Sequence, residues 1–144
     1  MIKIPFKNNK NSRSDIDNFK GEIIEESLAN KEILKKIKIV STRIEKVTEK
    51  HKTPWLSEWT LHTVEIPESE AKKTAEEISE SLDRAHSGSY YADFKNSVRH
   101  YVIFCGKAFS IDRKNKEQYN EATRYGVSLG IPEHQLNFYT EAEK

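Results

Sequence analysis

The chain has 144 residues, 33% of them charged, and a formal net charge of +1, a length that suits one domain with its own hydrophobic core. Nucleic-acid binders generally have an excess of basic residues, so this nearly neutral net charge argues against a nucleic-acid partner. No apolar run approaches the roughly 20 residues of a membrane span, and the single cysteine fits a reducing compartment, so we expect a cytoplasmic protein without a membrane partner.

Residues 1–13 contain four basic residues and no acidic one. They predict a flexible basic segment ahead of a single α+β domain over residues 14–144. Large apolar residues then recur at helical spacing from Ile16 to Leu28, which predicts an amphipathic helix over residues 15–29. Gly21 falls inside this predicted helix, where it costs up to about 1 kcal/mol relative to alanine.

The hydrophobic period changes at Ile37. Alternating, β-branched residues predict strands over residues 37–48 and 59–66, separated by a turn that contains Pro54. Pro67 favours the start of a helix, and the residues after it predict one over about 67–83. Its apolar stripe consists of Ala71, Ala75, Ile78 and Leu82.

Three short strands are predicted next, over residues 90–95, 98–105 and 107–112, and a last helix is expected between Asn115 and Gly130. The elements then follow the order α-β-β-α-β-β-β-α. The expected fold class is α+β, with two layers: a largely antiparallel sheet of about five strands, and helices packed mainly on one face.

Two turns decide which side chains share a face of the three short strands. A two-residue turn at Gly106 places Phe104 on the same face as Phe109. At residues 96–98, a three-residue loop adds Phe94 to that face, whereas a two-residue loop would divide the apolar side chains between both faces. We expect the three-residue loop, because it keeps the apolar set together.

The face without helices is the predicted recognition surface. Tyrosine and carboxylate side chains suit a polar ligand, and a tyrosine ring suits stacking on a flat one. The candidate ligand-binding residues are Tyr91, Asp93, Lys95, Tyr101, Asp112 and Arg113, with His62 as a further candidate. The alternative is a solvated sheet face, whose cross-strand pairs contribute about 0.2–1 kcal/mol each.

These residues favour a binding or interaction module for an unidentified small ligand or protein. One alternative is a small enzyme acting on a polar metabolite, with His62 or Asp93 as general base. Asp93 and Asp112 are expected about 9–10 Å apart, near the upper end of the carboxyl separations of inverting glycosidases. The five histidines show no metal-ligand spacing and no phosphate-binding glycine loop exists, so no metal, cofactor or catalytic residue is predicted.

A further alternative is a homodimer formed through the same face or through the strand over residues 37–48. Leu61 and Ile103 are expected on the polar face, where apolar side chains gain from being covered. Trp55 and Trp59 suit either a partner contact or one end of the core, and the core is the favoured interpretation.

Several sequence motifs between Trp59 and Gln135, namely WTLHTVEIP, YADFKN, HYVIF, IDR and YGVSLGIPEHQ, resemble those of a family of small prokaryotic hypothetical proteins. The family is single-domain and of uncharacterised function. The resemblance implies one compact cytoplasmic domain, and it assigns no activity, cofactor or site residue to any position of this chain.

Overall fold

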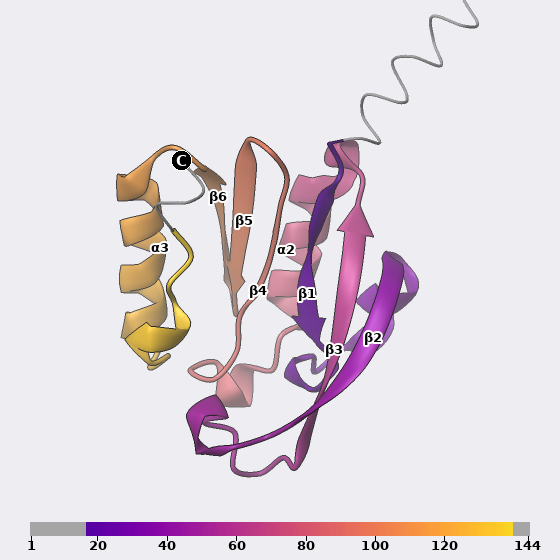
Figure 1. Ribbon diagram of the computed structural model, residues 1–144, viewed down its shortest axis with the longest axis vertical. Coiled ribbons are helices and arrows are strands. Elements are labelled where there is room, and N and C mark those ends of the chain that lie inside the picture. Colours follow the sequence, from indigo (N-terminus) through magenta and orange to yellow (C-terminus); the bar gives the residue numbers. More distant parts are fainter. Residues whose placement is uncertain (1–16, 140–144) are drawn as a thin grey trace, which may run out of the picture.

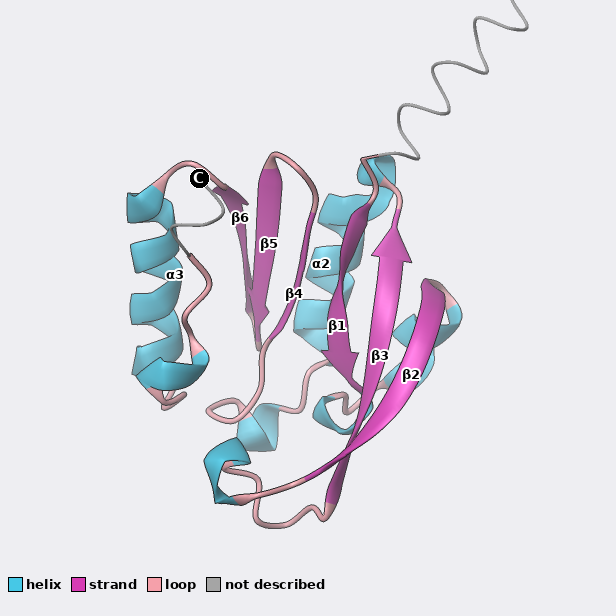
Figure 2. Ribbon diagram, in the orientation of Figure 1, coloured by secondary structure: helices cyan, strands magenta, loops and turns pink. Residues whose placement is uncertain are grey.

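The computed structural model describes residues 17–139, so the predicted basic segment at residues 1–13 lies outside the described residues. A six-stranded antiparallel sheet has the order β2-β3-β1-β4-β5-β6 (Figure 1). The strands are β1 (Phe19–Ile24), β2 (Lys38–Lys46), β3 (Glu58–Ile66), β4 (Ala92–Lys95), β5 (Arg99–Phe104) and β6 (Lys107–Asp112). The helices are α2 (Ala71–Ser81) and α3 (Lys116–Ser128), and short 3-10 helices occupy several connections (Figure 2).

The predicted α+β class and the antiparallel sheet are confirmed. Both helices after residue 67 also lie where the apolar periodicity placed them, and α3 begins at the predicted cap, because the Asn115 side chain accepts a hydrogen bond from the Gln118 amide. The number of elements differs: the described chain has six strands, where about five were expected, and two α-helices, where three were expected.

The prediction of a helix over residues 15–29 is wrong, since this region contains strand β1 and a 3-10 turn at Glu25–Ser27. Phe19 and Ile23 are both buried, and their spacing of four fits one face of a helix and also one face of a strand. Pairing with other strands decides between helix and strand: β1 is hydrogen-bonded between β3 and β4 at the centre of the sheet.

Gly21 is required by this central position. A Cβ atom at Gly21 would lie 1.9 Å from the Asp93 carbonyl oxygen and 2.5 Å from the Phe94 Cα atom. The residue that counted against a helix is therefore the one that allows β1 and β4 to approach each other closely.

The two helices cover opposite faces of the sheet, so the prediction that helices pack mainly on one face is wrong. Figure 1 shows α2 behind the middle strands and α3 beside β6. The turn between β4 and β5 explains the difference. Lys95 pairs with His100 and the Asn96 amide donates to the Arg99 carbonyl, which is the two-residue loop that the sequence argument rejected.

This turn divides the apolar residues between two cores. The core beneath α2 includes Ile78 of the helix and, from the sheet, Phe19, Val64, Phe94, Tyr101 and Ile103. The core beneath α3 includes Tyr119 and Ala122 of the helix, with Val102, Phe104 and Ile111 from the sheet and Leu136 and Phe138 from the C-terminal segment. The predicted sharing of a face by Phe104 and Phe109 is confirmed, because Gly106, with φ of 85°, closes a two-residue turn that pairs Phe104 with Lys107 and Val102 with Phe109.

Strand β2 forms one edge of the sheet and is exposed along most of its length. Its pairing with β3 is irregular between Ile39 and Ser41, and the apolar side chains of Ile39, Val40 and Ile44 remain largely accessible to solvent. Within residues 17–139, neither helix has the length and apolar composition needed to cross a membrane.

Candidate functional site

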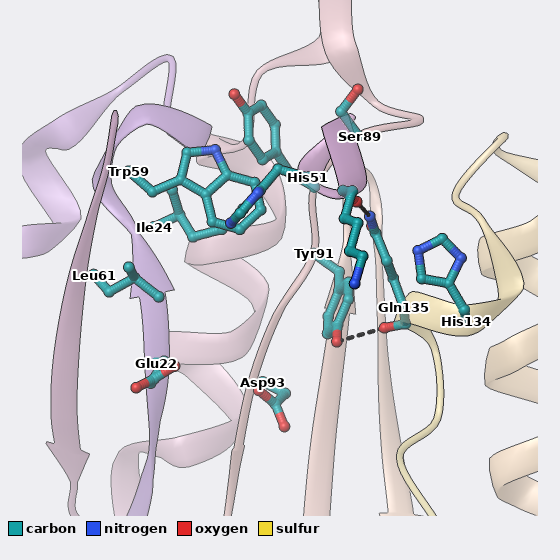
Figure 3. Close-up of a pocket in the computed structure, with 12 residues that line it drawn as sticks. Glu22, Ile24, His51, Trp59, Leu61, Ser89, Tyr91, Asp93, His134 and Gln135 are labelled. Atoms are coloured by element: carbon teal, nitrogen blue, oxygen red, sulfur yellow. Dashed lines mark hydrogen bonds between the residues drawn. The ribbon is translucent and has the colours of Figure 1, made fainter. Parts of the chain in front are cut away.

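Helix α3 and the C-terminal segment cover only the β5–β6 part of their sheet face, and a cleft of about 350 Å³ opens over the remainder (Figure 3). It lies between the β2–β3 connection and the 3-10 helix Glu133–Gln135. Its lining comes from segments far apart in the chain and comprises Glu22, Ile24, Lys50, His51, Trp59, Leu61, Ser89, Tyr90, Tyr91, Asp93, His134 and Gln135.

One side of the cleft is apolar and aromatic. Ile24 and Leu61 are directly paired across β1 and β3, so their side chains lie next to each other on the cleft face. Trp59 follows two residues earlier on the same strand face, and its indole N–H donates to Thr53 Oγ1 at 3.0 Å. The His51 ring meets the Trp59 ring edge to face, with 4.3 Å between centroids. The aromatic surface is thereby fixed in position before any ligand enters.

The tautomer of His51 follows from its hydrogen bonds. The Thr48 amide N–H donates to Nδ1 at 2.9 Å, so Nδ1 bears no proton. Nε2 then bears the proton and donates to the Glu45 carboxylate at 2.9 Å. Both ring nitrogens of His51 are thus hydrogen-bonded within the protein, and the ring contributes an aromatic surface to the cleft.

Two carboxylates lie at the other end of the cleft. Glu22 in β1 is the direct cross-strand partner of Asp93 in β4, and Figure 3 shows the two side chains at the end away from His51 and Ser89. Glu22 forms an ion pair with Arg43 of β2, and this hydrogen-bonded carboxylate raises the pKa of the Arg43 guanidinium. The negative charge of Glu22 is thus balanced by Arg43 of β2.

Asp93 is hydrogen-bonded to a histidine of the neighbouring strand β5. His100 Nε2 lies 2.7 Å from Asp93 Oδ2, and His100 Nδ1 lies 2.9 Å from the Tyr119 hydroxyl. The His100 side chain is 2% exposed while that of Asp93 is 32% exposed. The three groups therefore form a hydrogen-bonded chain that runs from the buried face of α3 to the surface of the cleft.

Gln135 joins both sides of the cleft. Its side-chain amide donates to the Lys50 carbonyl at 2.8 Å, and its own backbone carbonyl accepts a hydrogen bond of 2.7 Å from the Tyr91 hydroxyl (Figure 3). The Tyr91 ring packs edge-on against Phe138, with 5.1 Å between centroids. Burial raises the pKa of the Tyr91 phenol, and the nearby Asp93 charge adds to the shift.

Of the predicted site residues, the structure brings Tyr91 and Asp93 together in the cleft. Lys95 lies on the same sheet face beyond Asp93, outside the cleft lining. Tyr101 lies on the opposite face beneath α2 and is 9% exposed, in contact with Phe19 and Phe94. The sequence argument expected Tyr101 to face outward, and this is wrong. The two-residue β4–β5 loop pairs Tyr101 with Phe94, so both side chains lie on the face covered by α2.

Asp112 and Arg113 also lie away from the cleft. Asp112 pairs with Arg99 on the α2 side of the sheet, so it does not share a face with Asp93 and the proposed acid–base pair of these two residues is wrong. The Arg113 guanidinium donates to the Asn96 carbonyl at 2.6 Å, which ties the β4–β5 turn to the end of β6.

His62 lies on the face opposite the cleft. Its Nδ1 is 2.8 Å from Thr42 Oγ1 and its Nε2 is 2.7 Å from the Glu25 carboxylate, and the side chain is 9% exposed. His62, the further candidate, therefore does not line the cleft with Tyr91 and Asp93. Its position was decided by the register of β3, in which His62 pairs with Ile23 and not with a residue of the cleft face.

Sequence reasoning missed Glu22, His51 and Gln135. Glu22 was assigned to a helix, and the alternation of Lys20, Glu22 and Ile24 along β1 is the signal that would have placed it on one strand face. Leu61 and Ile103, which suggested a dimer interface, are both covered within the chain: Leu61 beside Ile24 in the cleft and Ile103 beneath α2.

Among residues 17–139 no group of three or more histidine, cysteine, aspartate or glutamate side chains is arranged to hold a metal ion. Comparison of the chain with protein-family models, curated proteins and solved structures found no match. The function of the cleft therefore has to be argued from its own chemistry.

Proposed function

We propose that the protein is a binding module that holds a small organic ligand in the cleft between the β2–β3 connection and Gln135. The main support is the combination of an apolar, aromatic side with a polar end inside one concavity of about 350 Å³. Small-molecule sites typically have this composition: a mostly apolar lining with a few polar groups that fix the orientation of the ligand.

The rigidity of the lining further supports this proposal. Trp59 is fixed by Thr53 and His51, and Tyr91 is fixed by Gln135 and Phe138. Side chains that are already held in place lose little conformational freedom on binding, which reduces the entropic cost of association. A solvated sheet face has no need for aromatic side chains held in this way.

The two tryptophans allow a direct test. Trp59 lines the cleft, whereas Trp55 is 46% exposed and stacks on His86 outside it. In a Trp55→Phe variant, Trp59 is the remaining tryptophan, so its emission reports on the cleft. We expect a saturable change in emission with at least one member of a set of one-ring alcohols, amines, carboxylates and sugars.

The reciprocal variant is the control. Trp59→Phe retains Trp55, and its emission should not respond to the same compound. The absence of a saturable response in the Trp55→Phe variant, across the whole set, would contradict the proposal. A response of equal size from Trp55 alone would also contradict it.

A second candidate function is an enzyme on a polar metabolite, with Asp93 as general base. The hydrogen-bonded chain of Asp93, His100 and Tyr119 supports it, because a buried imidazole behind a carboxylate can orient that carboxylate and take up or release a proton. A mixture of polar metabolites would be incubated with the wild type and with Asp93→Asn and compared by mass spectrometry. Conversion by the wild type alone supports this function, and identical mixtures contradict it.

We further propose a cytoplasmic location for the module. Cys105 is the single cysteine of the chain, is 8% exposed and remains a free thiol. Chains exported to oxidising compartments commonly use paired cysteines, and this chain has none to pair. Fractionation of cells that produce the untagged protein would test the location, and recovery outside the cytoplasmic fraction would contradict it.

A further inference from the structure

We infer that Thr42 is a nucleophilic hydroxyl that accepts an acyl group from activated esters, with His62 as its general base. The inference depends on three side chains: Thr42 of β2, His62 of β3 and Glu25 of the 3-10 turn after β1. This site lies on the sheet face opposite the cleft, and none of its three residues lines the cleft. The inference therefore goes beyond the proposed binding function and is tested separately from it.

Thr42 and His62 are direct partners in the antiparallel pairing of β2 and β3. The Thr42 Oγ1 atom lies 2.8 Å from His62 Nδ1, and His62 Nε2 lies 2.7 Å from the Glu25 carboxylate. A hydroxyl, an imidazole and a carboxylate joined in this order form the arrangement of an activated nucleophile. The base is within hydrogen-bond reach of the hydroxyl, and a third group orients the base.

The hydrogen bonds determine where the hydroxyl proton points. An ionised carboxylate only accepts hydrogen bonds, so the His62 ring donates from Nε2 to Glu25. In the neutral ring the other nitrogen, Nδ1, then has a free lone pair, and the Thr42 hydroxyl is its donor. The Thr42 proton thus already points at the atom that removes it during attack.

The nucleophile is accessible, whereas its base is shielded. Thr42 is exposed on the edge strand, while the side chain of His62 is 9% exposed and that of Glu25 is 35% exposed. An acyl donor can therefore approach the hydroxyl from solvent while the imidazole stays in contact with it. Ile44, 56% exposed, follows two positions along β2 on the same strand face. It offers an apolar contact to a short acyl chain.

The reaction is the transfer of an acyl group to the threonine. Thr42 Oγ1 attacks the carbonyl carbon of the ester and forms a new C–O bond, while the hydroxyl proton moves to His62 Nδ1. The tetrahedral intermediate collapses by breaking the bond between that carbon and the leaving oxygen. The leaving oxygen takes the proton from His62. The products are acylated Thr42, a free alcohol or phenol, and the neutral imidazole.

The chain contains a second trio of the same residue types, which provides an internal control. Thr48 Oγ1 lies 3.0 Å from His51 Nδ1, and His51 Nε2 lies 2.9 Å from the Glu45 carboxylate. In this trio, however, the Thr48 backbone amide donates to His51 Nδ1 at 2.9 Å and occupies its lone pair. The Thr48 hydroxyl accepts from the Lys50 amide at 3.3 Å. Thr48 therefore has the same kinds of neighbours as Thr42 but no available base.

Acetylation by p-nitrophenyl acetate tests the inference on the wild-type protein. After tryptic digestion the two threonines fall in different peptides, residues 39–43 and 47–50, and fragment ions distinguish Thr42 from Ser41. We expect acetylation at Thr42 to be about 100-fold faster than at Thr48, which is the lower end of the contribution of a positioned base. Equal rates at the two threonines would overturn the inference, and this comparison requires no substitution.

Four variants assign the rate to the residues of the site. His62→Gln should lower acetylation at position 42 to the rate at Thr48, and Thr42→Ser should remain fast relative to Thr48. Glu25 is a positioning residue, because it acts through His62. Glu25→Asp retains the charge and Glu25→Gln retains the length, so Glu25→Asp should keep more of the rate. The opposite order would contradict the role of Glu25, and an undiminished rate in His62→Gln would overturn the assignment of the base.

Discussion

Gln135 and Lys50 are joined by a hydrogen bond of 2.8 Å between the Gln135 side-chain amide and the Lys50 carbonyl, although 85 positions separate them in the chain. This contact connects the β2–β3 connection to the C-terminal segment across the cleft. The two sides are otherwise built on opposite ends of the sheet order, since β2 and β3 lie at one edge and β6 at the other.

Replacement of Gln135 by alanine should loosen the cleft without unfolding the protein. The variant loses the bond to Lys50 but retains the backbone carbonyl that accepts from Tyr91. We expect the free energy of unfolding to fall by about 0.5–1.5 kcal/mol, and amide exchange to accelerate at residues 47–57 and 133–138. Glu133→Ala, an exposed change in the same 3-10 helix, is the control. Unchanged exchange in both segments would show that the contact does not hold the two sides together.

Replacement of Gly21 by alanine should destabilise the protein strongly. The added methyl group would lie 1.9 Å from the Asp93 carbonyl oxygen, which belongs to a paired strand and cannot move aside independently. Urea denaturation should show a loss of about 3 kcal/mol or more. Gly130→Ala is the matched control, since its nearest neighbour would be 3.8 Å away and its cost arises from a φ of 101° alone. That cost should be about 1–2 kcal/mol. Equal losses in the two variants would contradict the close approach of β1 and β4.

Tyr119→Phe should weaken the core beneath α3. His100 is 1% exposed, and the variant removes the hydroxyl that lies 2.9 Å from its Nδ1. A buried polar group that loses its partner costs about 1–3 kcal/mol, and this is the decrease in unfolding free energy that we expect. Tyr125→Phe, in the same helix with a half-buried ring, should cost less than half as much. A neutral Tyr119→Phe would mean that the hydrogen-bonded chain behind Asp93 does not stabilise the fold.

Asp83→Asn should change the dependence of stability on pH. The Asp83 carboxylate accepts hydrogen bonds from His86 Nδ1 at 2.8 Å and from the Ala85 amide at 3.0 Å, and the His86 bond is the main cause of its lowered pKa. Because the folded pKa is below the ordinary value of 3.8, the stabilisation is fully present above that value and is lost as the pH falls through the folded pKa.

The wild type should therefore exceed Asp83→Asn in stability near neutral pH by a small amount, about 0.2–1 kcal/mol, since the pair is partly exposed. The difference should begin to shrink as the pH falls toward 3.8 and should vanish once the pH is below the folded pKa. Denaturant titrations of both proteins across this range measure it, with Glu80→Gln on the exposed face of α2 as the control. A difference that grows as the pH falls would give the opposite sign and exclude this account.

The sequence predicted the fold best where a local rule decided the outcome. Gly106 provides the positive φ of the β5–β6 turn, and the pairing of Val102 with Phe109 follows from that turn alone. The helix stripes of α2 and α3 were equally clear, because helical spacing over several turns has no strand equivalent.

The sequence failed where the outcome depended on contacts distant in the chain. The sequence argument placed Phe94 and Phe104 on one face, which assumes that helices cover a single face of the sheet. Here both faces are covered, Phe94 by α2 and Phe104 by α3. The spacing of Phe19 and Ile23 fitted a helix and a strand alike, and only the neighbouring strands decide between them.

The same limits apply to the candidate site. Tyr91 and Asp93 were found because alternation within β4 places them on one face. Glu22 comes from the segment that was assigned to a helix, and Gln135 comes from a tail without regular periodicity. The half of the cleft built on β4 could therefore be predicted, and the half built by β1 and the C-terminal segment could not.

The irregularity in β2 has a consequence for how copies of this molecule meet each other. An incoming strand finds a regular row of backbone donors and acceptors only beyond Ser41, since the pairing shifts between Ile39 and Ser41. The charged side chains of Arg43, Glu45 and Lys46 occupy that remaining stretch, and charged residues on an exposed edge, lysine above all, disfavour pairing with another strand. Continued growth into fibrillar stacks is thus obstructed, despite the solvent-accessible isoleucines, and concentrated solutions of the protein should stay clear.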